Sequence, residues 1–249
     1  MSLIPEKPRA PKRISPKITV LYGAPKVGKS TAVAGLPNHL HLDMEGGCDF
    51  LSGTIVDFPQ IVKNMNKDRD VEALGSINKM DVLRLVYQEA QATPDKYQYV
   101  SFDTVDELEK MCQEDVTRQF GVDFSELGYG QGYNLVRSNM INTLDYFVDL
   151  GMSVLVIGHR KRSIVGEGNA EVKISELDLQ GKNKNVVMSH ADAIAYVGRS
   201  EEGVLQLSFK AGVNEGVEAG SRTPHLVGKK ILLNQPSDWT QVYPELSTK

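Results

Sequence analysis

An eight-residue segment from Gly23 to Ser30 constrains this chain more than any other feature of its sequence. It reads Gly-Ala-Pro-Lys-Val-Gly-Lys-Ser and fits the phosphate-loop pattern G-x-x-x-x-G-K-[ST] in full. A strand-like run at 18–22 precedes it and a helix-like run at 30–36 follows it. Backbone N–H groups of such a loop point at the phosphates, and the following helix N-terminus adds partial positive charge. The segment therefore predicts a strand, loop and helix that bind a nucleoside triphosphate.

The residue types in this loop have separate physical roles. Gly23 and Gly28 allow the backbone to approach the phosphates closely. Lys29 is expected to reach the terminal phosphates, and Ser30 is expected to hold Mg²⁺. The residues expected to bind the nucleotide are Gly23, Ala24, Pro25, Lys26, Val27, Gly28, Lys29, Ser30 and Thr31.

The composition of the 249-residue chain is that of an ordinary soluble globular protein, with 41% hydrophobic and 24% charged residues. Because the net charge is −4, any contact with nucleic acid has to come from a local patch. Cys48 and Cys112 have no paired or metal-type spacing, which favours a reducing cytoplasm. No apolar run approaches the roughly 18 residues of a membrane helix, and the N-terminus lacks the apolar core of a signal peptide. No membrane partner is expected.

Short apolar strands alternate with helical patterns, as in a mainly parallel α/β sheet flanked by helices. The strands are predicted at 18–22, 39–43, 97–103 and 153–158, and the helices at 81–92, 105–120 and 134–150. Later strands at 191–197, 204–209 and 230–233 predict an antiparallel extension of the same sheet. Residues 50–80 show little periodicity and are interpreted as a loop with short helical pieces.

Residues 1–17 contain four prolines and five Lys or Arg residues. Because proline fixes φ and removes a hydrogen-bond donor, this segment is predicted to be an extended or disordered basic arm. It is either a solvated leader or an arm that grips a neighbouring subunit or nucleic acid. Residues 18–249 are predicted to form a single domain.

Asp103 ends an apolar run that comes one crossover after the phosphate loop. A hydrophobic strand that ends in Asp is the Walker B pattern, in which the carboxylate holds the water shell of Mg²⁺. Asp also follows many strands as a turn or helix cap. The position after the phosphate loop favours the metal role for Asp103, together with Ser30.

Glu45 is the candidate base for hydrolysis. Hydrolysis needs a group that orients or deprotonates the attacking water, and a carboxylate beside the γ-phosphate can serve. Glu45 lies just past the predicted strand at 39–43, and ligands of open α/β sheets bind at this carboxyl edge. Asp43 is an alternative base, and both residues could instead cap the next segment.

His159 follows the predicted strand at 153–158. A polar residue at the tip of this strand can hydrogen-bond the γ-phosphate and report hydrolysis to the loop that follows. His159 fits such a sensor role, although histidine at a strand end is often an ordinary hydrogen-bonded group.

The order of these segments resembles that of RecA-like P-loop ATPases. It is most similar to the compact phage-encoded nucleotide-binding proteins linked to single-strand annealing and recombination. The segments are the phosphate loop, Leu42-Asp43-Met44-Glu45-Gly46-Gly47, Val100-Ser101-Phe102-Asp103-Thr104 and Val156-Ile157-Gly158-His159. Tyr129-Gly130-Gln131-Gly132-Tyr133 and Ala219-Gly220-Ser221-Arg222 are also similar, and the match spans about residues 18–233.

This resemblance implies a RecA-like fold for residues 18–249, binding of ATP and Mg²⁺, and ATPase activity. It implies that Glu45 activates water and that Asp103 is the Walker B acid. His159 stands where the recombinases carry Gln, which leaves the sensor chemistry open. If the chain is phage-encoded, its compartment is the cytoplasm of the bacterial host.

Basic residues follow His159 directly in the run Arg160-Lys161-Arg162, and a polar stretch with glycines continues to Lys184. In RecA-like proteins a loop at this position enters the DNA channel, so the resemblance implies a DNA-binding loop here. A solvated surface loop or a short hairpin is the alternative. Tyr129 and Tyr133 are candidates for base stacking, or for anchors that pack their own loop.

Lys210 and Arg222 lie at or beyond late strands. In ring and filament ATPases a neighbouring subunit commonly inserts a cation at the γ-phosphate, where it stabilises the charge that develops during transfer. Lys210 and Arg222 are the candidates for this role, and are otherwise surface cations. In the first case hydrolysis requires an oligomer.

The sequence thus predicts an ATP-hydrolysing, single-stranded-DNA-binding protein of phage-type DNA recombination, annealing or replication. The expected partners are further copies of the chain in a ring or filament, single-stranded DNA and a single-strand-binding protein. One alternative is a small-molecule or nucleotide kinase, although the 160–184 segment is too mixed in sign for an arginine-rich lid. The other is an annealing module that ATP stabilises with negligible turnover.

Overall fold

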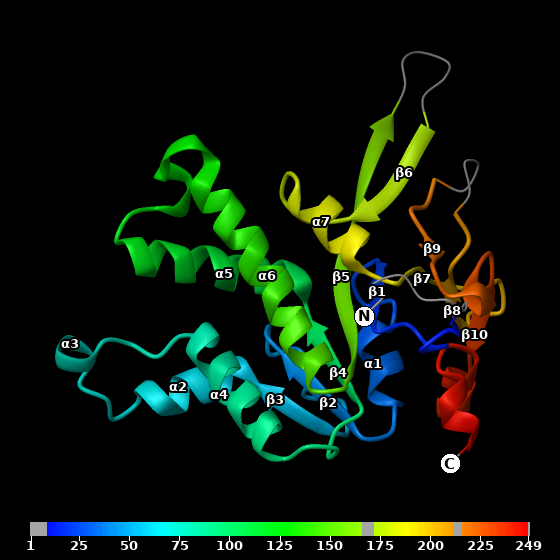
Figure 1. Cartoon of the computed structure of the whole chain (residues 1–249), viewed down its shortest axis with the longest axis horizontal. Coiled ribbons are helices and arrows are strands. Elements are labelled where there is room, and N and C mark those ends of the chain that lie inside the picture. Colours follow the sequence, from blue (N-terminus) through cyan, green and yellow to red (C-terminus); the bar gives the residue numbers. More distant parts are fainter. Residues whose placement is uncertain (1–8, 166–171, 212–215, 249) are drawn as a thin grey trace, which may run out of the picture.

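A mainly parallel sheet runs through the molecule, with helices on both faces (Figure 1). The computed structural model describes residues 9–165, 172–211 and 216–248. The strand order is β10-β8-β7-β1-β5-β4-β2-β3, while β6 pairs with β5 and β9 pairs with β7 outside this path. The predicted α/β fold class is confirmed.

The strands that build the sheet are short, apart from β5. They are β1 (Ile18–Gly23), β2 (His39–Asp43), β3 (Thr54–Asp57), β4 (Tyr99–Asp103), β5 (Ser153–Val165), β6 (Val172–Leu177), β7 (Ala193–Arg199), β8 (Leu205–Ser208), β9 (Gly220–Ser221) and β10 (Lys230–Leu233).

Most of the helical residues lie between β3 and β5. The α-helices are α1 (Lys29–Ala34), α2 (Phe58–Asn66), α3 (Val71–Leu74), α4 (Lys79–Ala92), α5 (Val105–Phe120), α6 (Gln131–Asp149) and α7 (Asn183–His190). The short 3-10 turns are η1 (Phe124–Glu126), η2 (Gly128–Gly130), η4 (Pro224–Leu226), η5 (Pro236–Gln241) and η6 (Pro244–Thr248).

The two faces of the sheet bury two separate apolar clusters, as the alternation of side chains along a strand requires. In β1, Val20 and Tyr22 belong to the cluster under the longer helices α4, α5 and α6. Leu21, between them, belongs to the cluster that contains Val33 of α1 and Trp239 near the C-terminus. Helix α1 and the C-terminal turns therefore cover one face, and the longer helices cover the other.

The late antiparallel extension is confirmed, but it begins one strand later than the sequence predicts. Strand β7 pairs in parallel with β1, since α7 carries the chain back across the sheet before β7 begins. The antiparallel pairs are those of β8 with β7, β10 with β8 and β9 with β7.

The interpretation of residues 50–80 as a loop with short helical pieces is wrong in part. Thr54–Asp57 forms the edge strand β3, which pairs with β2 on one side only, and α2 is a nine-residue helix. The Asp57 side chain caps α2 by accepting a hydrogen bond from the Gln60 N–H at 2.9 Å. The strand spans only four residues, and the helix follows it directly. The apolar spacing of each element therefore repeats too few times to be recognised in the sequence.

The long strand β5 also differs from its prediction, which ends at residue 158. It continues to Val165 and pairs with β6 as two arms of an antiparallel hairpin. Figure 1 shows both arms projecting beyond the rest of the sheet. The glycines at 166 and 168, which motivate a loop in the sequence, lie outside the described residues.

The described part of the basic N-terminal segment, residues 9–17, forms neither helix nor strand. Arg13 donates a hydrogen bond to the Ser153 hydroxyl at 2.6 Å, and the buried Ser15 bonds to Glu245. Arg13 thus contacts the start of β5, and Ser15 contacts the C-terminal turn η6. Residues 1–8 lie outside the described range, and the predicted boundary at residue 17 stays a prediction.

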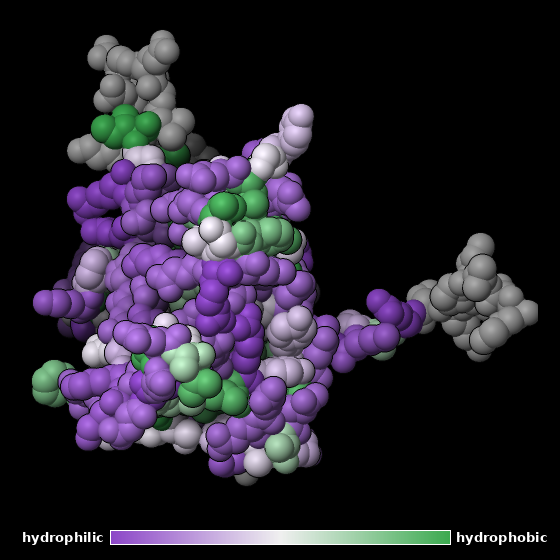
Figure 2. All heavy atoms as spheres, turned by 90° about the vertical axis from the view of Figure 1, so that its left-hand side faces the viewer, coloured by the Kyte–Doolittle hydropathy of each residue, from purple (hydrophilic) through white to green (hydrophobic). Residues whose placement is uncertain are grey.

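The face that lies on the left of Figure 1 is mostly hydrophilic, with small separated apolar areas (Figure 2). Apolar side chains such as Leu74 and Val122 are exposed, as is common in globular proteins. Among the described helices, none combines the length and the apolar character needed to cross a membrane.

Trp239 is 1% exposed and donates a hydrogen bond from Nε1 to the Ala32 carbonyl at 2.9 Å. Replacing Trp239 with Ala should lower the free energy of unfolding by about 3–5 kcal/mol, because a large buried cavity is left. Urea denaturation followed by circular dichroism measures this. Phe50→Ala is the matched control, since Phe50 is 98% exposed. Equal losses in the two variants would contradict the packing described here.

Candidate active site

The parallel strands bring four predicted site residues to one edge of the sheet. Gly23 at the end of β1 lies opposite His159 of β5, and Asp43 at the end of β2 lies opposite Asp103 of β4. This carboxyl edge is where open α/β sheets bind their ligands. The register alone therefore clusters the phosphate loop with the three polar strand ends.

Two glycines give the phosphate loop its shape. Gly28 has a φ of 110° and forms the N-cap of α1, a backbone conformation that disfavours other residues. A Cβ atom on Gly23 would lie 2.4 Å from the Val197 carbonyl oxygen. Gly23 is therefore needed for the close approach of β7, a reason that the sequence did not show.

Lys29 is buried at the start of α1 and points back into the loop. Its Nζ donates hydrogen bonds to the carbonyls of Gly23 at 3.2 Å and Ala24 at 3.0 Å. Burial lowers the pKa of Lys29, and the nearby carboxylates of Asp103, Asp106 and Glu45 partly oppose this shift. The ammonium group thus lies in the place where triphosphate oxygens would replace these carbonyls as partners.

Ser30 and Asp103 bring two oxygen ligands together. The Ser30 hydroxyl donates a hydrogen bond to Oδ2 of the buried Asp103 at 2.5 Å. Hydroxyl and carboxylate oxygens are the donors that Mg²⁺ prefers in proteins. The pair therefore fits the ion that the sequence predicts here.

The carboxylate of Asp43 organises the loop that follows β2. It accepts hydrogen bonds from four consecutive backbone N–H groups, those of Glu45, Gly46, Gly47 and Cys48, at 2.7–3.3 Å. Asp43 is 3% exposed, and these backbone donors occupy both of its oxygens. Of the two carboxylates considered as a base, Asp43 is thus the one engaged in holding the loop.

Glu45 is exposed and leans on the strand end of β4. Its Oε1 accepts a hydrogen bond from the Thr104 hydroxyl at 2.7 Å. Thr104 directly follows Asp103 in the chain. Its side chain therefore ties the candidate base, Glu45, to the strand end that carries the candidate metal ligand, Asp103. Glu45 also lines the pocket that the phosphate loop borders.

His159 is paired with a carboxylate that the sequence analysis did not select as a site residue. Its Nδ1 lies 3.2 Å from Oδ2 of Asp106, in the first turn of α5. The hydrogen bond that His159 donates to Asp106 raises the pKa of His159, with burial opposing it. Burial would raise the pKa of Asp106, but the hydrogen bonds with His159 and Thr104 outweigh it and lower the value. The other Asp106 oxygen is buried and has no described partner.

A pocket of about 480 Å³ lies between the phosphate loop and these strand ends. Its size is within the range of roughly 300–1,000 Å³ typical of small-ligand sites. The predicted site residues that line it are Pro25, Lys26, Gly28, Lys29, Ser30, Thr31, Asp43, Glu45, Asp103 and His159. Cys48 and Phe50 also line it, and neither stands out in the sequence.

A second pocket of about 380 Å³ adjoins the phosphate loop on its other side. Gly28 and Thr31 line it together with Arg199, Gln235 and Trp239. Its far wall comes from β7 and the C-terminal turns, which meet the phosphate loop only in the folded chain. For that reason sequence reasoning could not assign these residues to a site.

The structure does not bring Lys210 or Arg222 to the pocket of its own chain. Lys210 is an exposed residue just after β8. Arg222 follows β9, which pairs with the beginning of β7 and so lies toward the opposite edge of the sheet from the phosphate loop. Arg222 donates a hydrogen bond to the Ser189 carbonyl and lies 3.8 Å from Asp192.

A family model described as an AAA domain matches residues 15–223. The chain belongs to this family. AAA domain membership and the complete phosphate loop show that the chain is a P-loop ATPase, and its sheet order fits the predicted RecA-like fold.

Among solved structures, one that is described as an ATPase domain is similar to this AAA-family chain. The TM-score is 0.44 and the sequence identity 11%, over 87% of this chain and 80% of that one. The search of curated proteins found no match.

Asp43→Ala should lower the free energy of unfolding by about 2–4 kcal/mol, because it leaves several partly buried N–H groups without an acceptor. Asp57→Ala is the matched control. Asp57 accepts one backbone N–H at the exposed start of α2, so its loss should cost about 1 kcal/mol. Urea denaturation compares the two, and a smaller effect for Asp43→Ala would be inconsistent with its role in the loop.

The pKa of His159 should lie above the reference value of 6.5, and Asp106→Asn should lower it. Because the folded pKa is raised, the pair stabilises the fold fully below pH 6.5, and this stabilisation is lost as the pH rises through the folded pKa. Titration of the ring resonances by NMR measures both values. Asp123→Asn, at an exposed carboxylate, should leave the His159 pKa unchanged.

Proposed function

We propose that the chain hydrolyses ATP as part of an oligomer that binds single-stranded DNA, and that it acts in phage-type DNA recombination, annealing or replication. The observation that carries this proposal is the continuity of β5. One strand runs from the pocket at His159 directly into the basic residues of the hairpin. Binding on the hairpin and the state of the nucleotide would then act on the same strand.

In the proposed hydrolysis, Glu45, Lys29 and His159 have separate roles. Glu45 accepts a proton from a water molecule, and the resulting oxygen attacks the γ-phosphorus. The bond from the γ-phosphorus to the bridging oxygen breaks, which leaves ADP and inorganic phosphate. Lys29 stabilises negative charge on the terminal phosphates, and His159 hydrogen-bonds the γ-phosphate.

Ser30 and Asp103 would hold Mg²⁺, which when bound neutralises phosphate charge. Thr104 holds Glu45 in place through its 2.7 Å hydrogen bond, so the base is oriented before the nucleotide arrives. The second pocket beside Gly28 offers space for the nucleoside part of ATP. Its walls from Arg199 and Gln235 would set the preference for a base.

The hairpin carries exposed cations, and the end where it leaves the sheet is held by contacts with the rest of the protein. Lys161 and Arg162 are exposed on the hairpin, just beyond its base, where they can contact DNA phosphates. At its base, Arg160 donates a hydrogen bond to the Tyr196 hydroxyl at 2.7 Å, and Lys184 pairs with Glu176 and Glu218. These contacts join the hairpin to β7 and to the segment after residue 216.

Tyr129 is fully exposed and stays the better candidate for stacking on a base. Tyr133 is 42% exposed and packs edge-on against Phe124 at a centroid distance of 5.2 Å, which favours an anchoring role. A single-strand-binding protein stays a predicted partner, for which no contact surface is assigned.

In this proposal Lys210 or Arg222 acts on the nucleotide of a neighbouring subunit. Neither residue lines the pocket of its own chain, so the role requires an oligomer. The basic segment before residue 18 could add contacts between subunits or with DNA. Ring and filament assemblies are both compatible with this arrangement.

ATP hydrolysis should be stimulated by single-stranded DNA and should rise more steeply than linearly with protein concentration. Phosphate release is measured with and without DNA, with Lys29→Ala as the blank. The double variant Lys161→Ala/Arg162→Ala should lose most of the stimulation, and its DNA affinity should depend less on salt. Lys63→Ala, on α2, is the control cation. Linear turnover that ignores DNA would contradict the proposal and favour a kinase or a monomeric ATPase.

Mixing two inactive variants tests the role of a neighbouring cation. Arg222→Ala retains the phosphate loop, while Lys29→Ala retains Arg222. If Arg222 acts in the adjacent subunit, each variant should be nearly inactive alone, and the mixture should recover part of the wild-type rate. Lys210→Ala is mixed with Lys29→Ala in the same way. Activity of Arg222→Ala and Lys210→Ala alone at the wild-type rate would exclude both residues from hydrolysis.

A further inference from the structure

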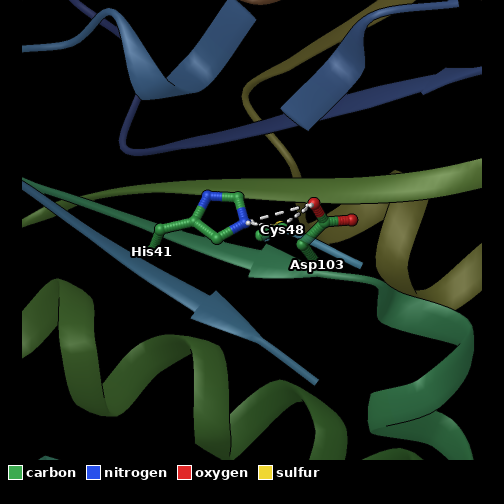
Figure 3. Close-up of side chains that lie close together, drawn as sticks. All are labelled: His41, Cys48 and Asp103. Carbon is green, nitrogen blue, oxygen red and sulfur yellow. Dashed lines mark hydrogen bonds and ion pairs between the residues drawn. The ribbon is translucent and has the colours of Figure 1, made fainter. Parts of the chain in front are cut away.

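An imidazole, a thiol and a carboxylate meet in the interior beside the nucleotide pocket (Figure 3). They belong to His41, Cys48 and Asp103, which are 2%, 6% and 7% exposed. We propose that these three residues form a binding site for Zn²⁺, and that a bound zinc ion inhibits the ATPase by taking Asp103 away from Mg²⁺. The inhibition rests on the proposed role of Asp103, whereas the zinc site does not.

The distances among the three groups agree with a tetrahedral zinc site. Oδ2 of Asp103 lies 3.2 Å from Nε2 of His41, which lies 3.2 Å from Sγ of Cys48. The third edge, from Sγ to Oδ2, is 4.0 Å. With zinc bonds of about 2.0–2.3 Å, tetrahedral ligands lie roughly 3.3–3.6 Å from one another. An ion between these atoms therefore requires shifts of only a few tenths of an ångström.

Separate elements hold the three ligands in place. His41 and Asp103 come from the neighbouring strands β2 and β4, whose pairing fixes their separation (Figure 3). Cys48 lies on the loop that Asp43 organises, and the Cys48 N–H itself donates to Asp43 Oδ2 at 2.9 Å. The donor set is thus present before any ion binds, which lowers the entropic cost of binding.

A second layer of hydrogen bonds orients the imidazole. Nδ1 of His41 lies 2.8 Å from the Ser101 hydroxyl, which lies 2.9 Å from Nε2 of His39. With zinc on Nε2, the imidazole proton lies on Nδ1, from which it donates to the Ser101 hydroxyl. Zinc-bound histidines are usually oriented by such a partner on the other ring nitrogen.

The choice of zinc follows from the donor types. Nitrogen, sulfur and oxygen together suit Zn²⁺, whereas Mg²⁺ prefers oxygen and avoids thiolate. Cys48 and Asp103 both line the 480 Å³ pocket, which gives the ion a path of entry and room for a water molecule as fourth ligand. On binding, the Cys48 thiol releases its proton to the solvent and becomes a thiolate.

Inhibition follows from a shared oxygen atom. Oδ2 of Asp103 is the atom that accepts the hydrogen bond from Ser30 and also the atom paired with His41. If zinc binds Oδ2 of Asp103 on the side of His41, the lone pairs of this oxygen are no longer directed toward Ser30 and the water shell of Mg²⁺. A large excess of Mg²⁺ should not reverse the effect, because it cannot replace zinc at nitrogen and sulfur.

Cobalt(II), a spectroscopic substitute for zinc, tests the site without any activity measurement. Adding Co²⁺ alone to the full chain should produce the visible bands of tetrahedral cobalt and a near-ultraviolet thiolate-to-cobalt band. Zn²⁺ should remove both. Cys48→Ser should abolish the thiolate band. His41→Gln should weaken cobalt binding by at least the roughly 10- to 100-fold that is typical for loss of an outer-shell partner, because His41 is a direct ligand. Cys112→Ser is the matched control, since Cys112 is a buried cysteine of α5 outside this cluster.

The same proteins then give the effect on hydrolysis as the ratio of rates with and without Zn²⁺. This ratio should lie well below one in the wild type and in Cys112→Ser, and close to one in Cys48→Ser. Circular dichroism shows whether each variant is folded. Absence of the cobalt bands in the folded wild type, or their persistence in folded Cys48→Ser, would overturn the zinc site. If the wild type gives the cobalt bands but shows no ATPase activity, the zinc site is supported and the proposed function is contradicted.

Discussion

The parallel register of four neighbouring strands is the constraint on which the rest of this structure depends. With β1, β5, β4 and β2 in order, their carboxyl ends form one edge, where polar or glycine residues gather. Burying Lys29 and Asp103 at this edge is costly unless each is paired, because a charge in the interior loses its hydration. The hydrogen bonds among loop carbonyls, Ser30 and the strand ends supply these partners before any nucleotide arrives.

In the loop after β2, one buried carboxylate positions two side chains of different chemistry, a carboxylate and a thiol. Asp43 collects four backbone N–H groups, and the turn that results leaves Glu45 exposed at the pocket and Cys48 in the interior. The exposed carboxylate and the buried thiol then both lie close to the strand end that carries Asp103. A proposed base for hydrolysis and a proposed zinc ligand therefore depend on the same short turn, which ties the metal chemistry of the pocket to its geometry.

The sequence predicted the elements closely where local signals were strong. The helix at 105–120 and the strands at 39–43 and 230–233 have the predicted bounds. Helix α4 begins two residues before its prediction, at Lys79, because Asn78 and Asp81 form a capping box that outweighs the weaker apolar spacing. The short edge strand β3 escaped prediction, since local propensity does not report its pairing with β2. The extension of β5 into a hairpin agrees with the alternative that the sequence left open after His159.

By itself, the sequence determined the phosphate loop, the binding of a nucleoside triphosphate that the loop implies, and the polar strand ends that surround it. These are local properties, because loop geometry and strand termination depend on adjacent residues. Only the tertiary structure decided which groups touch. It paired His159 with Asp106, placed Asp43 under its own loop, put Arg222 toward the far edge of the sheet, and joined His41, Cys48 and Asp103 in one cluster. Such contacts arise from strand register and from the path of loops through space, which residue spacing along the chain does not encode.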